Sequence, residues 1–416
     1  MSVRAGELAA FAAALAAVLP LSVPADAALH DFFRRNPQLG QRDRAFVADG
    51  VFAVLRRRRS LTAQAQTSAP RELAIAGAVR ELGLSLRELE SALTPEELGW
   101  ARDFKARKPL LSAAEAADLP DWLWDALGTA LPAEREPLAR AWLNPAPLDL
   151  RVNPLKTTRE AARAALAADG VDAAPTPYSP LGLRVAGRPA LQRHPLLLEG
   201  GIEIQDEGSQ LVCYLVAPRR NDMVVDFCAG AGGKTLLLGA LMRSQGRLYA
   251  FDVSPSRLAK LKPRLARSGL SNVHPVRIAD ERDNRIKRLS GKIDRVLVDA
   301  PCTGFGTLRR NPDLKWRVPQ AAMVELTAKQ ARLLAAAAGL VKPAGRLVYA
   351  TCSVLREENE AMVEGFLASH PAFVLGDAAT ELARAGIGLD SGAMLRLYPH
   401  RQGCDGFFAA VLERRP

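Results

Sequence analysis

The sequence has few cysteines and no motif that would bind a structural metal. Its five cysteines are an odd number, and no two have CxxC spacing. This argues against a disulfide framework and a zinc site, so we expect no metal. Residues 8–23 are rich in alanine and leucine and predict an amphipathic helix, with a signal peptide ending at Ala25-Asp26-Ala27 as the alternative. No later run could span a bilayer, so we expect a cytoplasmic protein without membrane contact.

The charge balance favours a polyanionic partner. The formal net charge is +11, and the isoelectric point is about 9.7. Nucleic acid is the first candidate for such a partner. Arg56-Arg57-Arg58-Arg59 directly follows an apolar helical stretch. This run is interpreted either as a solvated helix end, where cations are favourable, or as a contact to RNA phosphates.

Three segments differ in their hydrophobic patterns. Residues 1–143 show helical spacing, as in Val47-Val51-Val54-Leu55, and lack the alternation of strands. Residues 144–210 begin at the proline-rich linker 144–147 and predict a small α+β module, with strands at 148–152 and 181–185 and a helix at 158–168. Residues 211–416 alternate strand and helix, which predicts an α/β domain with a parallel sheet covered on both faces.

The strands of the third segment predict where its ligand site lies. We expect five parallel strands, followed by two further strands at 394–398 and 407–412; the parallel strands are 223–227, 248–251, 273–278, 293–298 and 346–350. Asp226, Asp252, Asp280 and Asp299 stand at or just beyond four strand ends. The carboxyl edge of such a sheet is where ligands bind, although an Asp there can also act only as a helix N-cap.

A glycine-rich turn joins the first strand to its helix. The run Asp226-Phe227-Cys228-Ala229-Gly230-Ala231-Gly232-Gly233-Lys234 ends like a P-loop, but Cys228 replaces the required first glycine. It starts like a dinucleotide motif, but Thr235 replaces the third glycine. S-adenosylmethionine is the third ligand that such a turn can bind. It carries no phosphate, its sulfonium suits a nearby acid, and Asp252 would accept from its ribose hydroxyls.

Two cysteines follow predicted strands at the same sheet edge. They stand in Asp299-Ala300-Pro301-Cys302-Thr303-Gly304 and Ala350-Thr351-Cys352-Ser353. Carbon 5 of a pyrimidine has no lone pair, so it needs a thiolate to add at carbon 6 before it can attack a methyl sulfonium. The attacking cysteine must be partly ionised. Asp299 would donate to the pyrimidine N3 only if its carboxyl group were protonated.

The motifs resemble the Sun/Fmu family of RNA cytosine-5 methyltransferases, and within it the RsmB-like branch. The loop resembles D-x-C-A-A-P-G-G-K, and long matches cover DAPCTGFGTLRRNPDLKW at 299–316 and KPAGRLVYATCSVLREENE at 342–360. IQDEGSQ at 204–210 and LGQRDR at 39–44 match as well. The resemblance covers about residues 30 to 413 and implies a class I, Rossmann-like methyltransferase domain at 211–416. It also implies a NusB-like RNA-binding domain at 1–143 and an RNA-binding module at 144–210.

The resemblance further implies the roles of individual residues. Cys352 is the nucleophile, Cys302 assists product release, and Asp299 contacts both cytosine and cofactor. The residues implied to hold S-adenosylmethionine are Cys228, Ala229, Gly230, Ala231, Gly232, Gly233, Lys234, Asp252, Arg257, Asp280 and Asp299. The implied activity is methylation of a cytosine in RNA, with 16S rRNA as the expected substrate and a monomeric enzyme. The alternatives are a tRNA methyltransferase and a non-catalytic ribosome assembly factor.

Two features of these motifs leave questions open. Gly230-Ala231 stands where the family has Ala-Pro, and without the fixed φ of proline we expect a more mobile loop and weaker cofactor binding. Pro301-Cys302 has the form of the attacking cysteine in DNA cytosine-5 methyltransferases, so Cys302 is the rival nucleophile. Arg309, Arg310, Lys315 and Trp316 are interpreted either as substrate contacts or as a solvated loop with a core tryptophan.

Overall fold

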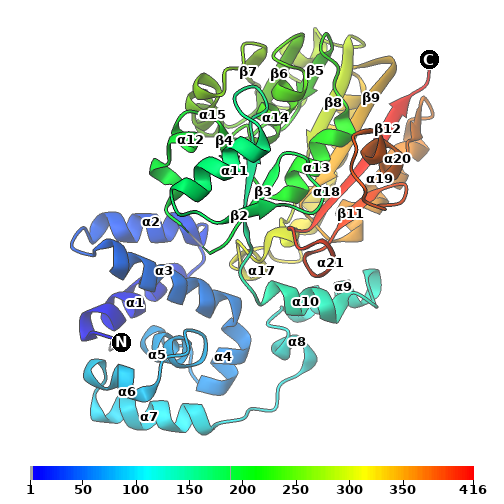
Figure 1. Cartoon of the computed structure of the whole chain (residues 1–416). Helices are drawn as coiled ribbons and strands as arrows, with labels where there is room; N and C mark the ends of the chain where they lie inside the picture. The colour runs from blue at the N-terminus through cyan, green and yellow to red at the C-terminus, as the bar shows by residue number, and fades with distance from the viewer. Residues whose placement is uncertain (1–2, 188) are drawn as a thin grey trace. The chain divides into compact units, whose positions relative to one another are not determined.

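The computed structural model describes residues 3–187 and 189–416 and divides into two compact units (Figure 1). Unit 1 holds the chain up to Pro145 together with Thr307–Gln320. Unit 2 holds Ala146–Gly306 and Ala321–Pro416. Within the described residues, no helix has the length and apolar character needed to cross a bilayer.

Unit 1 is all-helical, as its apolar spacing predicts. Its helices are α1 (Ala5–Val18), α2 (Ala25–Arg35), α3 (Gln41–Arg56), α4 (Arg58–Ala65), α5 (Pro70–Arg80), α6 (Leu86–Leu89), α7 (Pro95–Ala106), α8 (Ala113–Ala116), α9 (Asp121–Ala130), α10 (Arg135–Trp142) and α17 (Leu314–Arg317). The amphipathic α1 lies in the core, where Phe11 is fully buried. A Cβ at Gly50 would lie 2.5 Å from the Phe11 ring, so only glycine lets α3 approach α1 this closely.

The arginine run of unit 1 has protein partners. Arg56 donates to the carbonyl of Arg309 at 3.1 Å, and Arg59 donates to Asp121 at 2.8 Å. The Arg57 guanidinium lies 3.4 Å from Glu81. The guanidinium of Arg58 lies 6.0 Å from the centre of the Trp316 ring. These contacts make the run part of the packed structure of unit 1, in place of the fully solvated helix end that was one interpretation of its sequence.

The segment 307–320 belongs to unit 1 although it follows the Cys302 motif in sequence. Lys315 is 2% exposed and donates from Nζ to the Arg56 carbonyl at 2.8 Å, and Trp316 donates from Nε1 to the Leu55 carbonyl at 2.8 Å. These are the last carbonyls of α3, which a helix leaves without internal partners and which attract cations. Lys315 and Trp316 therefore complete a helix end, a role that the sequence motif alone did not indicate.

Unit 2 begins with the small α+β module. Its four-stranded antiparallel sheet has the order β2-β3-β1-β4 and carries α11 (Arg159–Ala168) and α12 (Pro195–Leu198); the strands are β1 (Leu148–Val152), β2 (Ala173–Pro175), β3 (Gly182–Val185) and β4 (Ile202–Ile204). Two of these strands and α11 are predicted by the sequence. The short β2 and β4 are not, because three residues are too few to show alternation.

The rest of unit 2 is the α/β sheet that the sequence predicts. The strands are β5 (Met223–Asp226), β6 (Arg247–Asp252), β7 (Val273–Arg277), β8 (Ile293–Asp299), β9 (Val341–Thr351), β10 (Phe373–Leu375), β11 (Leu395–Leu397) and β12 (Phe407–Arg414). Their order is β10-β12-β9-β8-β5-β6-β7, with β11 beside β12. The strands β5 to β9 are parallel, and β10, β11 and β12 pair antiparallel.

Helices cover both faces of this sheet (Figure 1). Successive strand residues enter different cores: Val224 and Leu297 pack in one, and Val225 and Val296 in the other. The first core also holds α13 (Glu207–Val216), α14 (Gly233–Leu241), α15 (Pro255–Ser268) and α20 (Ala378–Arg384). The second holds α16 (Asn284–Lys287), α18 (Ala322–Ala338) and α19 (Glu360–Ser369), and the remaining helix is α21 (Pro399–Gln402).

Candidate active site

A pocket of about 580 Å³ lies at the carboxyl ends of β5 to β9. Its lining includes all but one of the residues that the sequence assigns to catalysis or cofactor binding: Cys228, Ala229, Gly230, Ala231, Gly233, Lys234, Asp252, Arg257, Asp280, Asp299, Cys302 and Cys352. The one outside the lining is Gly232. Its φ is +84°, and a Cβ there would lie 2.1 Å from the Leu261 side chain. Glycine is needed at this position so that α14 can begin against α15.

Asp252 ties the glycine loop to the end of β6. Its Oδ2 accepts from the Gly230 N–H at 2.8 Å, and its Oδ1 accepts from the Ser254 N–H at 2.7 Å. Gly230 itself has φ +56°, in the left-handed region that glycine adopts readily. One carboxylate therefore holds both the loop and the start of α15 beside the pocket. It lies at the strand end where folds of this kind place the acid that binds a ribose.

Asp226, the first of the strand-end acids, lies behind the pocket and does not line it. It is 1% exposed, and its Oδ2 accepts from the Thr235 hydroxyl at 2.6 Å. The other oxygen, Oδ1, has no hydrogen-bond partner. Burial raises the pKa of Asp226 to about 7, although the hydrogen bond from Thr235 opposes this. Asp226 therefore holds the first turn of α14, and the sequence did not distinguish it from the acids that face the pocket.

Lys234 and Asp299 form an ion pair in the pocket. The Lys234 Nζ lies 2.7 Å from the Asp299 Oδ2. Lys234 is 9% exposed, and burial alone would lower the pKa of its ammonium group, but the pair with Asp299 raises it. Lys234, which resembles the lysine of a P-loop in sequence, therefore neutralises an acid in this structure.

Cys302 and Cys352 lie side by side in the same pocket. Their Sγ atoms are 3.4 Å apart, although 50 residues separate them in sequence. The hydrogen bond with Cys352 and the burial of the site raise the pKa of the Cys302 thiol well above its ordinary value. This shift favours the protonated form of Cys302. The buried Cys213 and Cys404 line no part of this pocket.

A buried network fixes the loops that carry the two thiols. Glu358 accepts from the N–H of Thr303 at 2.9 Å and from its hydroxyl at 2.6 Å. The Gln330 amide donates to the same carboxylate at 2.9 Å, and the Ser353 hydroxyl lies 3.2 Å from the Thr303 hydroxyl. Because Thr303 and Ser353 each directly follow one of the cysteines, this network sets the separation of the two sulfur atoms.

Gly306 adds a close backbone contact to this arrangement. Its N–H donates to the carbonyl of Cys352 at 2.9 Å. A Cβ at this position would lie 2.1 Å from the carbonyl oxygen of Gly406 and 2.8 Å from that of Cys352. Only glycine fits here, so the chain between the two cysteines stays close to the loop that carries the second one.

Residues that sequence reasoning did not assign also line the pocket. Gln205 reaches it from the connection between β4 and α13, Ser209 from the first turn of α13, and Lys329 and Leu333 from α18. Gln205 and Ser209 stand in the motif at 204–210, for which the sequence indicates no role of its own. With Ile278, the side chain of Leu333 gives the pocket an apolar wall. Among the described residues, no group of three His, Cys, Asp or Glu side chains is arranged to hold a metal.

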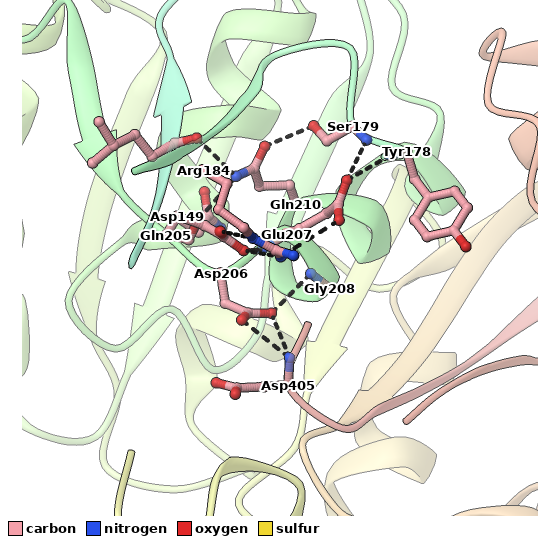
Figure 2. Close-up of polar contacts among 11 residues, drawn as sticks. Asp149, Tyr178, Ser179, Arg184, Gln205, Asp206, Glu207, Gly208, Gln210 and Asp405 are labelled. Carbon is pink, nitrogen blue, oxygen red and sulfur yellow. Dashed lines mark hydrogen bonds and ion pairs between the residues drawn. The ribbon is translucent and has the colours of Figure 1, made fainter. Parts of the chain in front are cut away.

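The same motif joins the small module to the sheet domain (Figure 2). Glu207 accepts from the backbone N–H groups of Tyr178 and Ser179, both at 2.7 Å. The Ser179 hydroxyl donates to Gln210 at 2.7 Å. Glu207 and Gln210 are fully buried, so both are withdrawn from solvent by these bonds. Their role in the structure is to hold the loop before β3 against α13.

Two further acids complete this junction (Figure 2). Asp149 on β1 accepts from the Arg184 guanidinium at 2.7 and 2.9 Å. This bidentate pair fixes the orientation of the guanidinium relative to the carboxylate. Asp206 accepts from the N–H of Gly208 at 2.8 Å and from that of Asp405 at 3.1 Å. The small module therefore brings Gln205 to the pocket on a rigid support.

Comparison with known proteins places these features in one family. The family model for 16S rRNA methyltransferase RsmB/F matches residues 213–413, and a ferredoxin-like domain of RsmF/B-like methyltransferases matches residues 119–192. The chain is 37% identical to the probable ribosomal RNA small subunit methyltransferase B of Synechocystis over 73% of its length and 68% of that protein. It is 35% identical to the ribosomal RNA small subunit methyltransferase B of Sodalis glossinidius, over 76% of its length and 71% of that protein.

Solved structures agree with this assignment. A methyltransferase homologue from Pyrococcus horikoshii aligns with a TM-score of 0.62 and 28% identity, over 73% of this chain and 100% of that one. The protein PH0851 aligns with a TM-score of 0.81 and 26% identity over 100% of both chains. These matches confirm the Rossmann-like methyltransferase fold with its helical N-terminal part. The chain belongs to the RsmB/F family of 16S rRNA methyltransferases.

Proposed function

We propose that this protein transfers a methyl group from S-adenosylmethionine to carbon 5 of a cytosine in 16S rRNA, with Cys352 as the covalent nucleophile. The observation that carries the proposal is the placement of two thiols, 3.4 Å apart, in the pocket that also holds Asp252 and the glycine loop. Methylation of oxygen or nitrogen needs no thiol, so this pair favours a carbon acceptor.

The lining residues fit S-adenosylmethionine. Asp252 offers a carboxylate at the end of β6, as ribose recognition requires, and Asp280 lies beyond β7. Ile278 and Leu333 offer apolar surface for an adenine ring. When bound, this cosubstrate supplies an electrophilic methyl group on its sulfonium. Residues 228–234, together with Arg257, Asp280 and Asp299, are the proposed remainder of its site.

The chemistry assigned to the chain begins with Cys352. Its thiolate adds to carbon 6 of a cytosine that has left its stack, and the electron pair of the 5,6 double bond becomes available at carbon 5. After carbon 5 has taken the methyl group, a base removes the carbon 5 proton. The electron pair of that C–H bond re-forms the 5,6 double bond as the bond between carbon 6 and sulfur breaks, and the electron pair of the C–S bond returns to Cys352. Cys302, whose protonated form is favoured, lies 3.4 Å away and assists this departure.

Asp299 is proposed to orient the cytosine. In the structure its carboxylate acts as an acceptor, because the Lys234 ammonium donates to it at 2.7 Å. An acceptor at this place suits the 4-amino group of cytosine, which donates to carboxylates in known base recognition. We therefore favour recognition of the amino group over the donation to N3 that was considered from the sequence.

The experiment is a methyl-transfer assay with isotope-labelled S-adenosylmethionine. Unmodified 16S rRNA, 30S particles and tRNA are each offered, and the digested nucleosides are separated by mass spectrometry. We expect labelled 5-methylcytidine in the small-subunit rRNA. Label in tRNA alone would assign the tRNA alternative. Cofactor binding without label in any RNA would favour a non-catalytic assembly factor.

A further inference from the structure

The glycine loop is held by a contact from outside the pocket. The Arg264 guanidinium on α15 donates from Nη1 to the carbonyl of Ala231 at 2.6 Å. The same guanidinium donates from Nε at 3.0 Å and from Nη2 at 2.8 Å to one oxygen of Glu203 on β4. A planar guanidinium has donors on both sides of a rigid fork, so the contact to Glu203 fixes the direction of the third donor.

Glu203 is itself firmly placed. It is 5% exposed, and its other carboxylate oxygen accepts from Arg267 at 2.9 Å. Burying a carboxylate is unfavourable unless it is paired and hydrogen-bonded, and here two guanidinium groups share it. The strand that carries Glu203 also leads to Gln205 in the pocket lining. The small module therefore holds Arg264 in place through Glu203, and Arg264 in turn restrains the loop through its bond to the Ala231 carbonyl.

Ala231 is the loop residue that most needs such support. It stands between Gly230 at φ +56° and Gly232 at φ +84°, and it lines the pocket. Two flanking glycines and an alanine leave this segment much backbone freedom, which must be lost whenever a ligand binds. A hydrogen bond to the Ala231 carbonyl in the free protein removes part of that freedom in advance.

We propose that Arg264 and Glu203 are positioning residues that hold the cofactor loop in its binding conformation, and that they supply the rigidity that Ala231 lacks. This inference rests on the proposed function, because it takes the pocket to be the S-adenosylmethionine site. Arg151 offers a similar contact from β1, donating to the Gly233 carbonyl at 2.6 Å. It is only 3% exposed and therefore a poor choice for substitution, whereas the Arg264 side chain is 20% exposed.

The test uses the full chain and S-adenosylhomocysteine as the probe. Calorimetric titration compares wild type with R264Q, E203Q and the double variant. We expect R264Q to weaken binding about tenfold, E203Q to weaken it less, and the double variant to match R264Q, because Glu203 acts through Arg264. K262Q is the matched control: it removes a positive charge from an exposed position on the same helix, and its affinity should stay within about twofold of wild type.

A second readout separates positioning from general stability. Hydrogen exchange of the free protein should show faster exchange at residues 230–233 in R264Q and unchanged exchange in β5. In turnover, KM for S-adenosylmethionine should rise while kcat at saturation stays near the wild-type value. Unchanged affinity and unchanged loop exchange in R264Q would overturn the inference. If the double variant bound more weakly than R264Q by the full effect of E203Q, the role assigned to Glu203 would be overturned. If wild type itself bound no S-adenosylhomocysteine, the proposed function would fail, and loop exchange in the free protein would still decide the role of Arg264.

Discussion

Lys234 and Asp299 meet at 2.7 Å in the pocket, at the start of α14 and the end of β8. The pair keeps a buried ammonium charged and leaves the carboxylate as an acceptor beside the two thiols. A P-loop lysine would face a phosphate, whereas this one faces an acid of its own chain. The difference decides what the pocket can recognise, since the paired site offers little free positive charge to a phosphate.

The first prediction concerns this ion pair. D299N keeps the shape of the side chain but removes the charge that Lys234 pairs with and that the cytosine amino group would use. We expect kcat to fall by about 100-fold or more, as for loss of a group that acts in the reaction step, with a smaller effect on S-adenosylhomocysteine affinity. Single-turnover methyl transfer and calorimetry measure the two quantities. A loss of affinity with kcat unchanged would assign Asp299 to cofactor binding alone.

The second prediction concerns Asp252. D252A removes the acceptor for two backbone N–H groups and the proposed acceptor for the ribose, so cofactor affinity should fall by about 30-fold or more. D283N is the control, because Asp283 caps α16 and lies outside the cofactor pocket. Calorimetry with S-adenosylhomocysteine measures both variants. An affinity of D252A equal to that of D283N would contradict the assignment.

The third prediction concerns the pH dependence of stability at Asp226. Burial raises its pKa in the folded chain to about 7, above the unfolded value. Its contribution to stability is therefore complete below about pH 4 and is lost as the pH rises through 7. D226N does not titrate, so its free energy of unfolding relative to wild type should improve by about 1 kcal/mol or more from pH 5 to pH 7.5. Urea denaturation at the two pH values measures this, and a pH-independent difference would refute it.

The fourth prediction concerns the pH dependence of stability at Lys315. Burial lowers the pKa of Lys315 to about 7 in the folded chain. The stabilisation is complete above the unfolded pKa and is lost as the pH falls towards 7. Wild type should therefore gain about 1–2 kcal/mol of stability between pH 7 and pH 9 relative to K315M, which has no charge to bury. Denaturation followed by tryptophan fluorescence reports on unit 1, because all five tryptophans lie in that unit. Parallel pH curves for the two proteins would count against the assignment.

Much of the fold could be predicted because its signals are local. The five parallel strands have apolar runs bounded by turn residues, and Leu8, Phe11, Leu15 and Val18 show the helical spacing of α1. The short strands β2, β4 and β10 have three residues each and form through pairing with longer neighbours, which no local pattern records. The contacts of α17 could not be predicted from the sequence for a related reason. Its Lys315 and Trp316 donate hydrogen bonds to carbonyls at the end of α3, which lie about 260 residues earlier in the chain.

The site divides in the same way. The loop, the strand-end acids and both cysteines follow strands, and a parallel sheet brings strand ends together, so their common pocket was predictable. The separation of Asp226 from the other acids was not, because its burial depends on how α14 covers β5. The contribution of Gln205 and Arg264 was hidden as well, since it depends on the docking of the small module. Arg264 also bears on the expectation of a mobile loop, because its bond to the Ala231 carbonyl restrains the segment that lacks proline.

The most direct test of the account is covalent trapping with matched cysteine variants. C302A and C352A are each incubated with substrate RNA and S-adenosylmethionine, denatured, and examined by gel mobility and intact mass. If the sulfur at 352 attacks and its neighbour 3.4 Å away assists release, C302A accumulates a denaturation-resistant RNA adduct and C352A forms none. An adduct on C352A and none on C302A would contradict the assignment of the nucleophile, and full methyl transfer by C352A would contradict the covalent mechanism itself.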